Sequence, residues 1–392
     1  MGAADASAAR RGVGLREVVR HWGRIGCIGF GGPPTHIALL RDLCVDRRRW
    51  LDSSEFEDAV AACNLLPGPA STQLAILCAW TVAGPAGAVA GGLAFILPGL
   101  VVILGLAALF LAASPPELVL GAAAGAGAAV AAVAVHAGAG LVPASRKRAS
   151  ARVRWFGYAL AGGVAAATIG PLLVVVLLGC GAIELGIRMF GASGRLGVHA
   201  GPLPLLAAAA AAVSGGGALA LVWVACKVGA LSYGGGFVII PLMQHDAVHH
   251  YHWMTDSQFL GAVALGQITP GPVVQTVAVV GYAAAGIGGG LLAAAVAFSP
   301  SFAFVLAGGR HFQALRRNAA ARAFLDGAGP AAIGAIIGAA LPLALALGQA
   351  WQLVVLGGAT LSLFALRRSV VLTLLVAALA GAIVVHLGAP LP

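Results

Sequence analysis

Long runs of apolar residues, separated by short clusters of charge, dominate the pattern of hydrophobic and polar positions along the chain. A helix needs roughly 20 apolar residues to cross a bilayer. The runs that reach or approach this length are Ala86–Ala113, Leu118–Val142, Leu205–Val222 and Gly327–Leu347. The pattern therefore predicts an all-α, polytopic membrane protein.

Composition supports this prediction. The chain has 392 residues, of which 60% are hydrophobic and 9% charged, whereas soluble proteins carry about 25% charge. The formal net charge is +10. Because the basic residues stand in short clusters between apolar runs, we interpret them as topology signals, with attraction of anions towards a pore as the alternative. No nucleic-acid partner is predicted.

Other sequence features exclude several kinds of site. The N-terminal segment has no apolar core, so no cleavable signal peptide is predicted. The six cysteines show no C-x-x-C spacing, and the histidines near His249 lie in one loop. We therefore predict no disulfide framework, metal or cofactor. No P-loop, nucleophile elbow or HExxH motif is present, and an enzyme is not expected.

The chain repeats itself at an offset of 203 residues, without a gap from Arg24 through the first Pro-Gly-Pro sequence. The repeat pairs Gly31-Gly32 with Gly234-Gly235, Trp50 with Trp253, and Pro67-Gly68-Pro69 with Pro270-Gly271-Pro272. We predict two homologous domains, residues 1–200 and 201–392. Internal duplication in a membrane protein is typical of transporters.

Loop charges predict that the two domains are inverted. Arg41–Trp50 is basic, whereas its counterpart Gln244–Trp253 has no Lys or Arg. Arg146–Arg154 is basic, whereas Leu347–Trp351 is uncharged. Under the positive-inside rule, equivalent loops therefore lie on opposite sides of the membrane. This predicts a bacterial inner-membrane protein with a cytoplasmic N-terminus and a periplasmic C-terminus.

The same rule predicts re-entrant segments. If Arg41–Arg49 and Arg146–Arg154 are both cytoplasmic and two full spans separate them, Glu55–Val82 must return to the side it left. We expect four broken hairpins and about nine full spans. The other broken hairpins are Arg16–Cys44, Val224–Met243 and Gln258–Ala285. The shorter spans are Trp155–Ile169, Leu172–Ile187, Trp351–Leu366 and Val370–His386, with Leu205–Val222 as a linking helix.

Helix breaks at matching places in two inverted domains predict a substrate site. Each break exposes unpaired N–H groups and the positive end of a helix dipole, which together attract anions. Hydroxyl and amide residues flank both Pro-Gly-Pro sequences, with the second copy better equipped; a simple kink is the alternative interpretation. The predicted substrate-binding residues of the first domain are Gly31, Gly32, His36, Asn64, Pro67, Gly68, Pro69, Thr72 and Gln73. Those of the second domain are Lys227, Gly234, Gly235, Gly236, Gln267, Thr269, Pro270, Gly271, Pro272, Gln275 and Thr276.

Two cations stand at equivalent positions ahead of the glycine breaks. Arg24 aligns with Lys227, which lies in an apolar run. Ionisable residues at such depth are functional candidates, so we consider both as counter-charges near the site, against the alternative of snorkelling side chains. His36 is a candidate neutral donor or titrating group, although its symmetry mate is Ile239.

The motifs resemble those of the chromate ion transporter family in its long, two-domain form. They are "FGGPPTHIALL" with "LLPGPASTQ", and "LSYGGGFVIIPLMQ" with "ALGQITPGPVVQTVAVVGY". The second set departs from the first by Gly236 in place of Pro33. The resemblance implies a membrane protein that exports chromate, with chromate resistance as the result and oppositely oriented domains.

Several alternatives stay open. Chromate is a tetrahedral dianion similar to sulfate, so a transporter of sulfate or another oxyanion is the first; a channel, a scaffold and a chromate reductase are less consistent with the motifs. The lipid bilayer is the expected surrounding, and a homodimer is left open. Moving one charge through 100 mV is worth about 2.3 kcal/mol, so a dianion leaving a negative-inside cell gains roughly 4.6 kcal/mol. Electrogenic export is therefore predicted.

Overall fold

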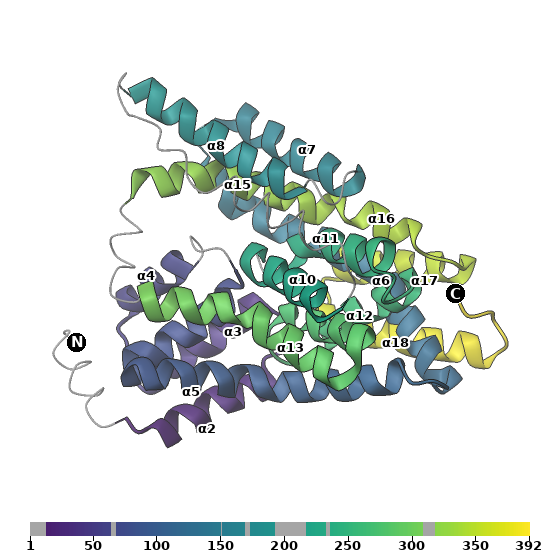
Figure 1. Cartoon of the computed structure of the whole chain (residues 1–392). Coiled ribbons are helices and arrows are strands. Elements are labelled where there is room, and N and C mark those ends of the chain that lie inside the picture. Colours follow the sequence, from purple (N-terminus) through teal and green to yellow (C-terminus); the bar gives the residue numbers. More distant parts are fainter. Residues whose placement is uncertain are drawn as a thin grey trace.

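The computed structural model describes residues 13–63, 68–149, 151–168, 173–192, 217–232, 236–308 and 318–392. Every regular element within these ranges is a helix, which confirms the all-α class (Figure 1). Four helices of the described part are long and apolar enough to cross a membrane, as a multi-pass protein requires. They contain α5 (Ala70–Phe110), α6 (Glu117–Arg148), α13 (Thr276–Gly308) and α15 (Ala319–Gly338).

The chain begins with a broken helical hairpin, formed by α2 (Leu15–Ile28) and α3 (Pro33–Arg41). Gly32 adopts φ 75° and ψ −157° between them, a conformation that is essentially restricted to glycine. The chain then returns to the start of α2, because Arg48 Nη1 lies 3.3 Å from Glu17 Oε1. Arg16–Cys44 therefore forms a broken hairpin that folds back on itself, and its re-entrant course in the membrane stays a prediction.

A second reversal divides α5, which follows α4 (Ser53–Cys63). Gly84 has φ 66° and ψ −162°, and a Cβ atom at Gly91 would lie 2.5 Å from Ala79 Cβ. Residues twelve positions apart in a straight helix are about 18 Å apart, so the helix folds back on itself at this point. The arm before Gly84 lies against α2, because Trp22 Nε1 donates to the Ala75 carbonyl at 2.7 Å.

Sequence analysis placed a boundary between Val82 and Ala86, and the reversal of α5 lies at this boundary. Glu55–Val82 and Ala86–Ala113 are joined by the tight reversal at Ala83–Gly84 rather than by a loop. The physical reason is that Gly84 alone supplies the backbone conformation that a hairpin between two helices needs. The expected linking helix Leu205–Val222 lies outside the described residues up to 216, and its last residues belong to α10 (Ala218–Leu231).

Local geometry of the first domain recurs in the second. The π-helical turns η1 (Asp42–Arg47) and η5 (His245–His250) are followed by left-handed residues, Arg49 with φ 53° and His252 with φ 52°. The reversal recurs at Gly286, with φ 63° and ψ −155°. Arg49 and His252 are 203 residues apart, whereas Gly84 and Gly286 are 202 apart. The second domain therefore has one residue fewer between these points.

Equivalent helices run in opposite directions. A Cβ atom at Gly92 on α5 would lie 2.5 Å from the Phe302 ring on α13, and one at Gly290 would lie 2.5 Å from Leu104 Cδ2. As α5 advances, α13 therefore recedes, and the two helices lie side by side and antiparallel (Figure 1). The predicted inversion of the two domains calls for this antiparallel course, and the inversion relative to the membrane stays a prediction.

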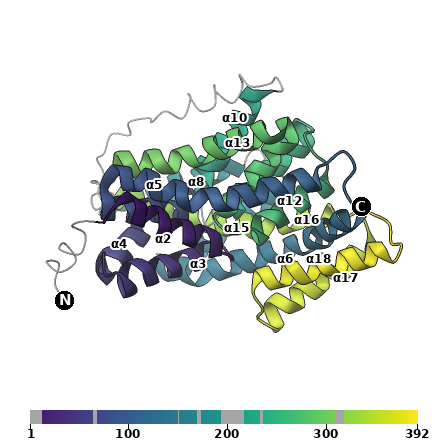
Figure 2. The same ribbon diagram turned by 90° about the horizontal axis from the view of Figure 1, so that it is seen from below.

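The two domains also interlock through their shorter helices. In the first domain these are α7 (Arg152–Thr168) and α8 (Leu173–Ala192); in the second they are α17 (Ala350–Thr360) and α18 (Val370–His386). The α7–α8 pair packs on α15 of the second domain, and α17–α18 packs on α6 of the first (Figures 1 and 2). Glycines such as Gly162, against the Ala331 carbonyl, allow the close approach.

Candidate oxyanion site

The break between α2 and α3 is bonded directly to the Pro-Gly-Pro turn of the second domain. The Gly29 carbonyl accepts a hydrogen bond from the Gly271 N–H at 3.0 Å and another from His36 Nε2 at 2.9 Å. His36 Nδ1 lies 3.2 Å from Ser71 Oγ. Because the carbonyl only accepts, Nε2 carries a proton, and in the neutral ring Nδ1 accepts from Ser71. His36 therefore links α2, α3 and the start of α5.

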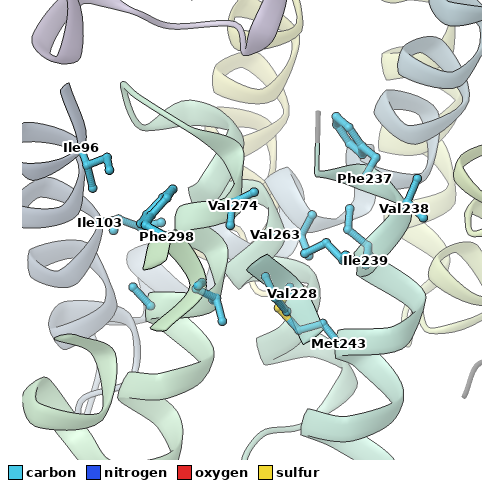
Figure 3. Close-up of a cluster of buried hydrophobic side chains, with 14 of the residues drawn as sticks. Ile96, Ile103, Val228, Phe237, Val238, Ile239, Met243, Val263, Val274 and Phe298 are labelled. Atoms are coloured by element: carbon cyan, nitrogen blue, oxygen red, sulfur yellow. The ribbon is translucent and has the colours of Figure 1, made fainter. Parts of the chain in front are cut away.

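Both glycine breaks reach the residues that follow the second turn. A Cβ atom at Gly32 would lie 3.6 Å from Val273 Cγ2, and one at Gly236 would lie 3.2 Å from Val274 Cγ2. Both glycines have positive φ, 75° and 93°. Predicted site residues from both domains thus meet here. Figure 3 shows Val274 among buried apolar side chains, including Phe298 of α13 and Phe237 of the second break.

The second turn, Pro270-Gly271-Pro272, is packed tightly against α5. A Cβ atom at Gly99 would overlap the Pro270 carbonyl oxygen, so only glycine fits at that position of α5. Gln275 Nε2 donates to the Ile96 carbonyl of the same helix at 2.7 Å. Backbone and side chain therefore both attach the second turn to the first domain.

Most polar side chains around the second turn already have partners within the protein. Thr269 Oγ1 donates to the Leu265 carbonyl at 2.8 Å, and Thr276 Oγ1 to the Val273 carbonyl at 2.9 Å. The expectation that this turn is the better equipped of the two therefore does not match the arrangement of its hydroxyl groups, which satisfy local helix carbonyls.

The first turn is Pro67-Gly68-Pro69, of which the structure describes Gly68 and Pro69. Gly68 lies against the second domain. Gly68 has φ 112°, and a Cβ atom there would lie 3.1 Å from the Gly229 carbonyl and 3.6 Å from Ser301 Oγ. Gln73 Nε2 would lie 2.7 Å from the same Cβ atom. The long helix α5 begins directly afterwards, and its N-cap residue Pro69 supplies no side-chain hydrogen bond. The predicted residues Asn64, Pro67, Gly234 and Gly235 lie outside the described residues.

Buried polar atoms without a hydrogen-bond partner gather around these turns. Within the described part of the chain they include Thr72 Oγ1, Gln267 Nε2, Gln275 Oε1 and Ser301 Oγ. Thr72 and Ser301 are 0% exposed and Gln267 is 6% exposed. An unsatisfied buried polar group costs about 1–3 kcal/mol, so such a concentration indicates a place that holds a polar ligand. The two hydroxyls and the Gln267 amide can donate to an oxyanion.

The two predicted cations occupy different surroundings. Lys227 Nζ pairs with Asp246 and lies 5.6 Å from the centre of the Trp223 ring. Its charge is therefore compensated in this conformation. Arg24 is exposed on α2. Neither cation is therefore a free counter-charge for an anion at the turns. The donors that remain there are neutral hydroxyl and amide groups.

Sequence reasoning noted Ser71 among the hydroxyl residues that follow the first turn, but it missed Gly99 and Ser301. The last two stand at equivalent positions, each directly after a proline inside a long helix, Pro98 or Pro300. These prolines are 202 residues apart. A search with an offset of 202 beyond the second turn would have paired Gly99 with Ser301.

A multi-pass helical protein with antiparallel equivalent helices and unpartnered donors at central helix breaks has the architecture of a membrane transporter. The chain belongs to the chromate transporter family, whose sequence profile matches residues 16–185 and 219–382. This is the family predicted from the motifs.

Named relatives cover most of the chain. A chromate transport protein of Cupriavidus metallidurans is 31% identical over 84% of this chain and 82% of its own length. A chromate transport protein of Pseudomonas aeruginosa is 30% identical over 80% and 77%. A probable chromate transport protein of Synechococcus elongatus is 28% identical over 84% of each chain. No solved structure matches the chain.

Proposed function

We propose that the chain exports chromate from the cytoplasm across a bacterial inner membrane. Membership of the chromate transporter family and similarity to proteins named for chromate transport support the substrate. The basic loops Arg41–Arg49 and Arg146–Arg154 support a cytoplasmic N-terminus and a periplasmic C-terminus. Transport, rather than chemical conversion of chromate, is the proposed activity.

The observation that carries this proposal is the set of unpartnered donors at the two turns. Thr72 Oγ1, Ser301 Oγ and Gln267 Nε2 are buried and can donate hydrogen bonds. Hydrogen bonds to a charged acceptor contribute about 1.5–3 kcal/mol each. A tetrahedral dianion offers oxygens in several directions, and neutral donors can release it again without separating a buried ion pair.

The opposite course of equivalent helices suggests how the anion crosses. Gly68 of the first domain contacts the second domain, and Gly271 of the second contacts the first. A rocking movement of one domain against the other would expose this junction to each side in turn, as in other inverted-repeat transporters. The membrane potential supplies roughly 4.6 kcal/mol per dianion at 100 mV, inside negative. We infer electrogenic export on this basis.

Uptake of labelled chromate into everted inner-membrane vesicles tests the proposal, because everted vesicles accumulate substrates of export. We expect saturable uptake in vesicles that contain the protein, and background uptake in vesicles from the same host with an empty vector. Background uptake with an inserted, monodisperse protein would contradict the assignment.

Sulfate is the second candidate, because the neutral donor set at Thr72 and Ser301 suits any tetrahedral dianion. Uptake of labelled sulfate in the same vesicles, and competition of chromate uptake by sulfate, compare the two substrates. Sulfate uptake without chromate uptake would establish sulfate transport instead.

A further inference from the structure

The two Pro-Gly-Pro turns face equivalent helix positions that carry different residues. The second turn packs on Gly99 of α5, where a Cβ atom would overlap the Pro270 carbonyl oxygen. The first turn packs near Ser301 of α13, whose Oγ lies 3.6 Å from a Cβ position at Gly68. At the first turn, the Ser301 side chain therefore lies between the turn and α13. At the second turn, the Pro270 carbonyl fills the equivalent space beside Gly99.

The second turn is fixed by bonds to the first domain, and the one unpartnered side-chain donor beside it in the described part of the chain is Gln267 Nε2. The Gly271 N–H donates to the Gly29 carbonyl, and Gln275 Nε2 donates to the Ile96 carbonyl. Because Ile96 offers only a carbonyl oxygen there, the orientation of the Gln275 amide is determined, and its unpartnered atom is the acceptor Oε1.

The first turn differs from the second by two buried, unpartnered hydroxyl groups. Thr72 Oγ1 and Ser301 Oγ are unpartnered hydroxyls, and each residue is 0% exposed. Thr72 is the third residue of α5, and the N-cap residue of this helix, Pro69, makes no side-chain hydrogen bond. The positive end of this helix and its first N–H groups favour an anion at the same place.

We propose that the oxyanion binds at the first turn, between the start of α5 and Ser301 of α13, with Thr72 and Ser301 as its hydroxyl donors. The second turn serves as a fixed connection between the domains. This inference rests on the proposed function and specifies which turn takes the anion. Ser301 is thereby a substrate-binding residue contributed by the second domain to a turn of the first.

Transport kinetics of hydroxyl-deletion variants test this inference. Ser301→Ala and Thr72→Val each remove one hydroxyl with little change in shape, and we expect the KM for chromate to rise about tenfold in each. Thr72→Ser keeps a hydroxyl and should retain a KM near that of the wild type. The matched controls are Ser299→Ala and Thr81→Val, because those hydroxyls already donate to the Val296 and Leu77 carbonyls; both should leave KM unchanged.

Thermal unfolding separates a binding role from a structural one. Deleting an unpartnered buried hydroxyl removes an unsatisfied group, so Ser301→Ala and Thr72→Val should unfold at the same or a higher temperature than the wild type. A chromate-induced rise in unfolding temperature, present in the wild type, should diminish in both variants.

The outcomes distinguish this inference from the proposed function. If the wild type transports chromate and both variants keep its KM, the inference is wrong and the function stands. If both variants unfold at lower temperature and lose no chromate affinity, the hydroxyls are structural and the inference is again wrong. If the wild type neither transports nor binds chromate, the proposed function fails first.

Discussion

Gly99 and His36 determine, at the scale of single residues, how closely the two domains approach. Gly99 allows the Pro270 carbonyl to lie against α5, and His36 shares the Gly29 carbonyl with the Gly271 N–H. Neither residue offers a free donor to the substrate in this arrangement. Both instead fix the second turn against the first domain.

Gly99→Ala is expected to lower the free energy of unfolding by about 1–3 kcal/mol, because the added methyl group overlaps backbone that cannot move independently. Thermal or denaturant unfolding in detergent measures the change. Gly105→Ala is the matched control on the same helix, since nothing lies within 4 Å of a Cβ atom there. Equal stability of the two variants would show that the second turn is not held as described.

Two residues mark the limits of prediction from sequence at this scale. Lys227 was predicted as a counter-charge, but its partner Asp246 has the apolar symmetry mate Leu43. No alignment of the two domains could have revealed that pair. Ser301 was missed for a different reason, because one residue fewer in the second domain moves it out of the 203-residue register.

Helix breaks and reversals define the next scale. The runs of apolar residues predicted the long spans, and the Gly-Pro motifs predicted the re-entrant hairpins. The segment boundaries predicted between Val82 and Ala86 and after Ala285 coincide with the reversals at Gly84 and Gly286, but a tight turn at a single glycine was not predicted, since the surrounding sequence is rich in glycine. Only the tertiary contacts, such as Gly91 against Ala79, distinguish a reversal from a continuous helix.

Gly84→Ala and Gly286→Ala should each destabilise the protein by about 1–3 kcal/mol, because no other residue adopts this backbone conformation without strain. The expected cost is purely conformational, since nothing lies within 4 Å of a Cβ atom at either glycine. Gly288→Ala is the control, with equally open surroundings and no positive φ. Unchanged unfolding temperatures for Gly84→Ala and Gly286→Ala would contradict the reversals.

At the scale of the whole molecule, the two sequence domains are not independent packing units. The α7–α8 pair packs on α15, and the α17–α18 pair packs on α6. The internal repeat predicted two domains, but it carried no information about which long helix each pair would contact. Glycines at these contacts, such as Gly381 against the Gly121 carbonyl, let helices of different domains pack closely.

This interlocking predicts the behaviour of a divided chain. Residues 1–200 and 201–392, expressed together from separate genes with a tag on one fragment, should purify as a complex. Each fragment expressed alone should be degraded or aggregate, because its long helix lacks the covering pair. Accumulation of either fragment alone as a monodisperse species would contradict the conclusion that each domain's short helix pair covers a long helix of the other domain.

Chromate flux from proteoliposomes tests the central claim most directly. Purified protein is reconstituted with chromate inside, and valinomycin with a potassium gradient sets an inside-negative potential. We predict protein-dependent chromate release that saturates with concentration and accelerates as the potential becomes more negative inside. Release at the rate of protein-free liposomes would contradict chromate transport by this chain, and release that does not respond to the potential would contradict electrogenic export.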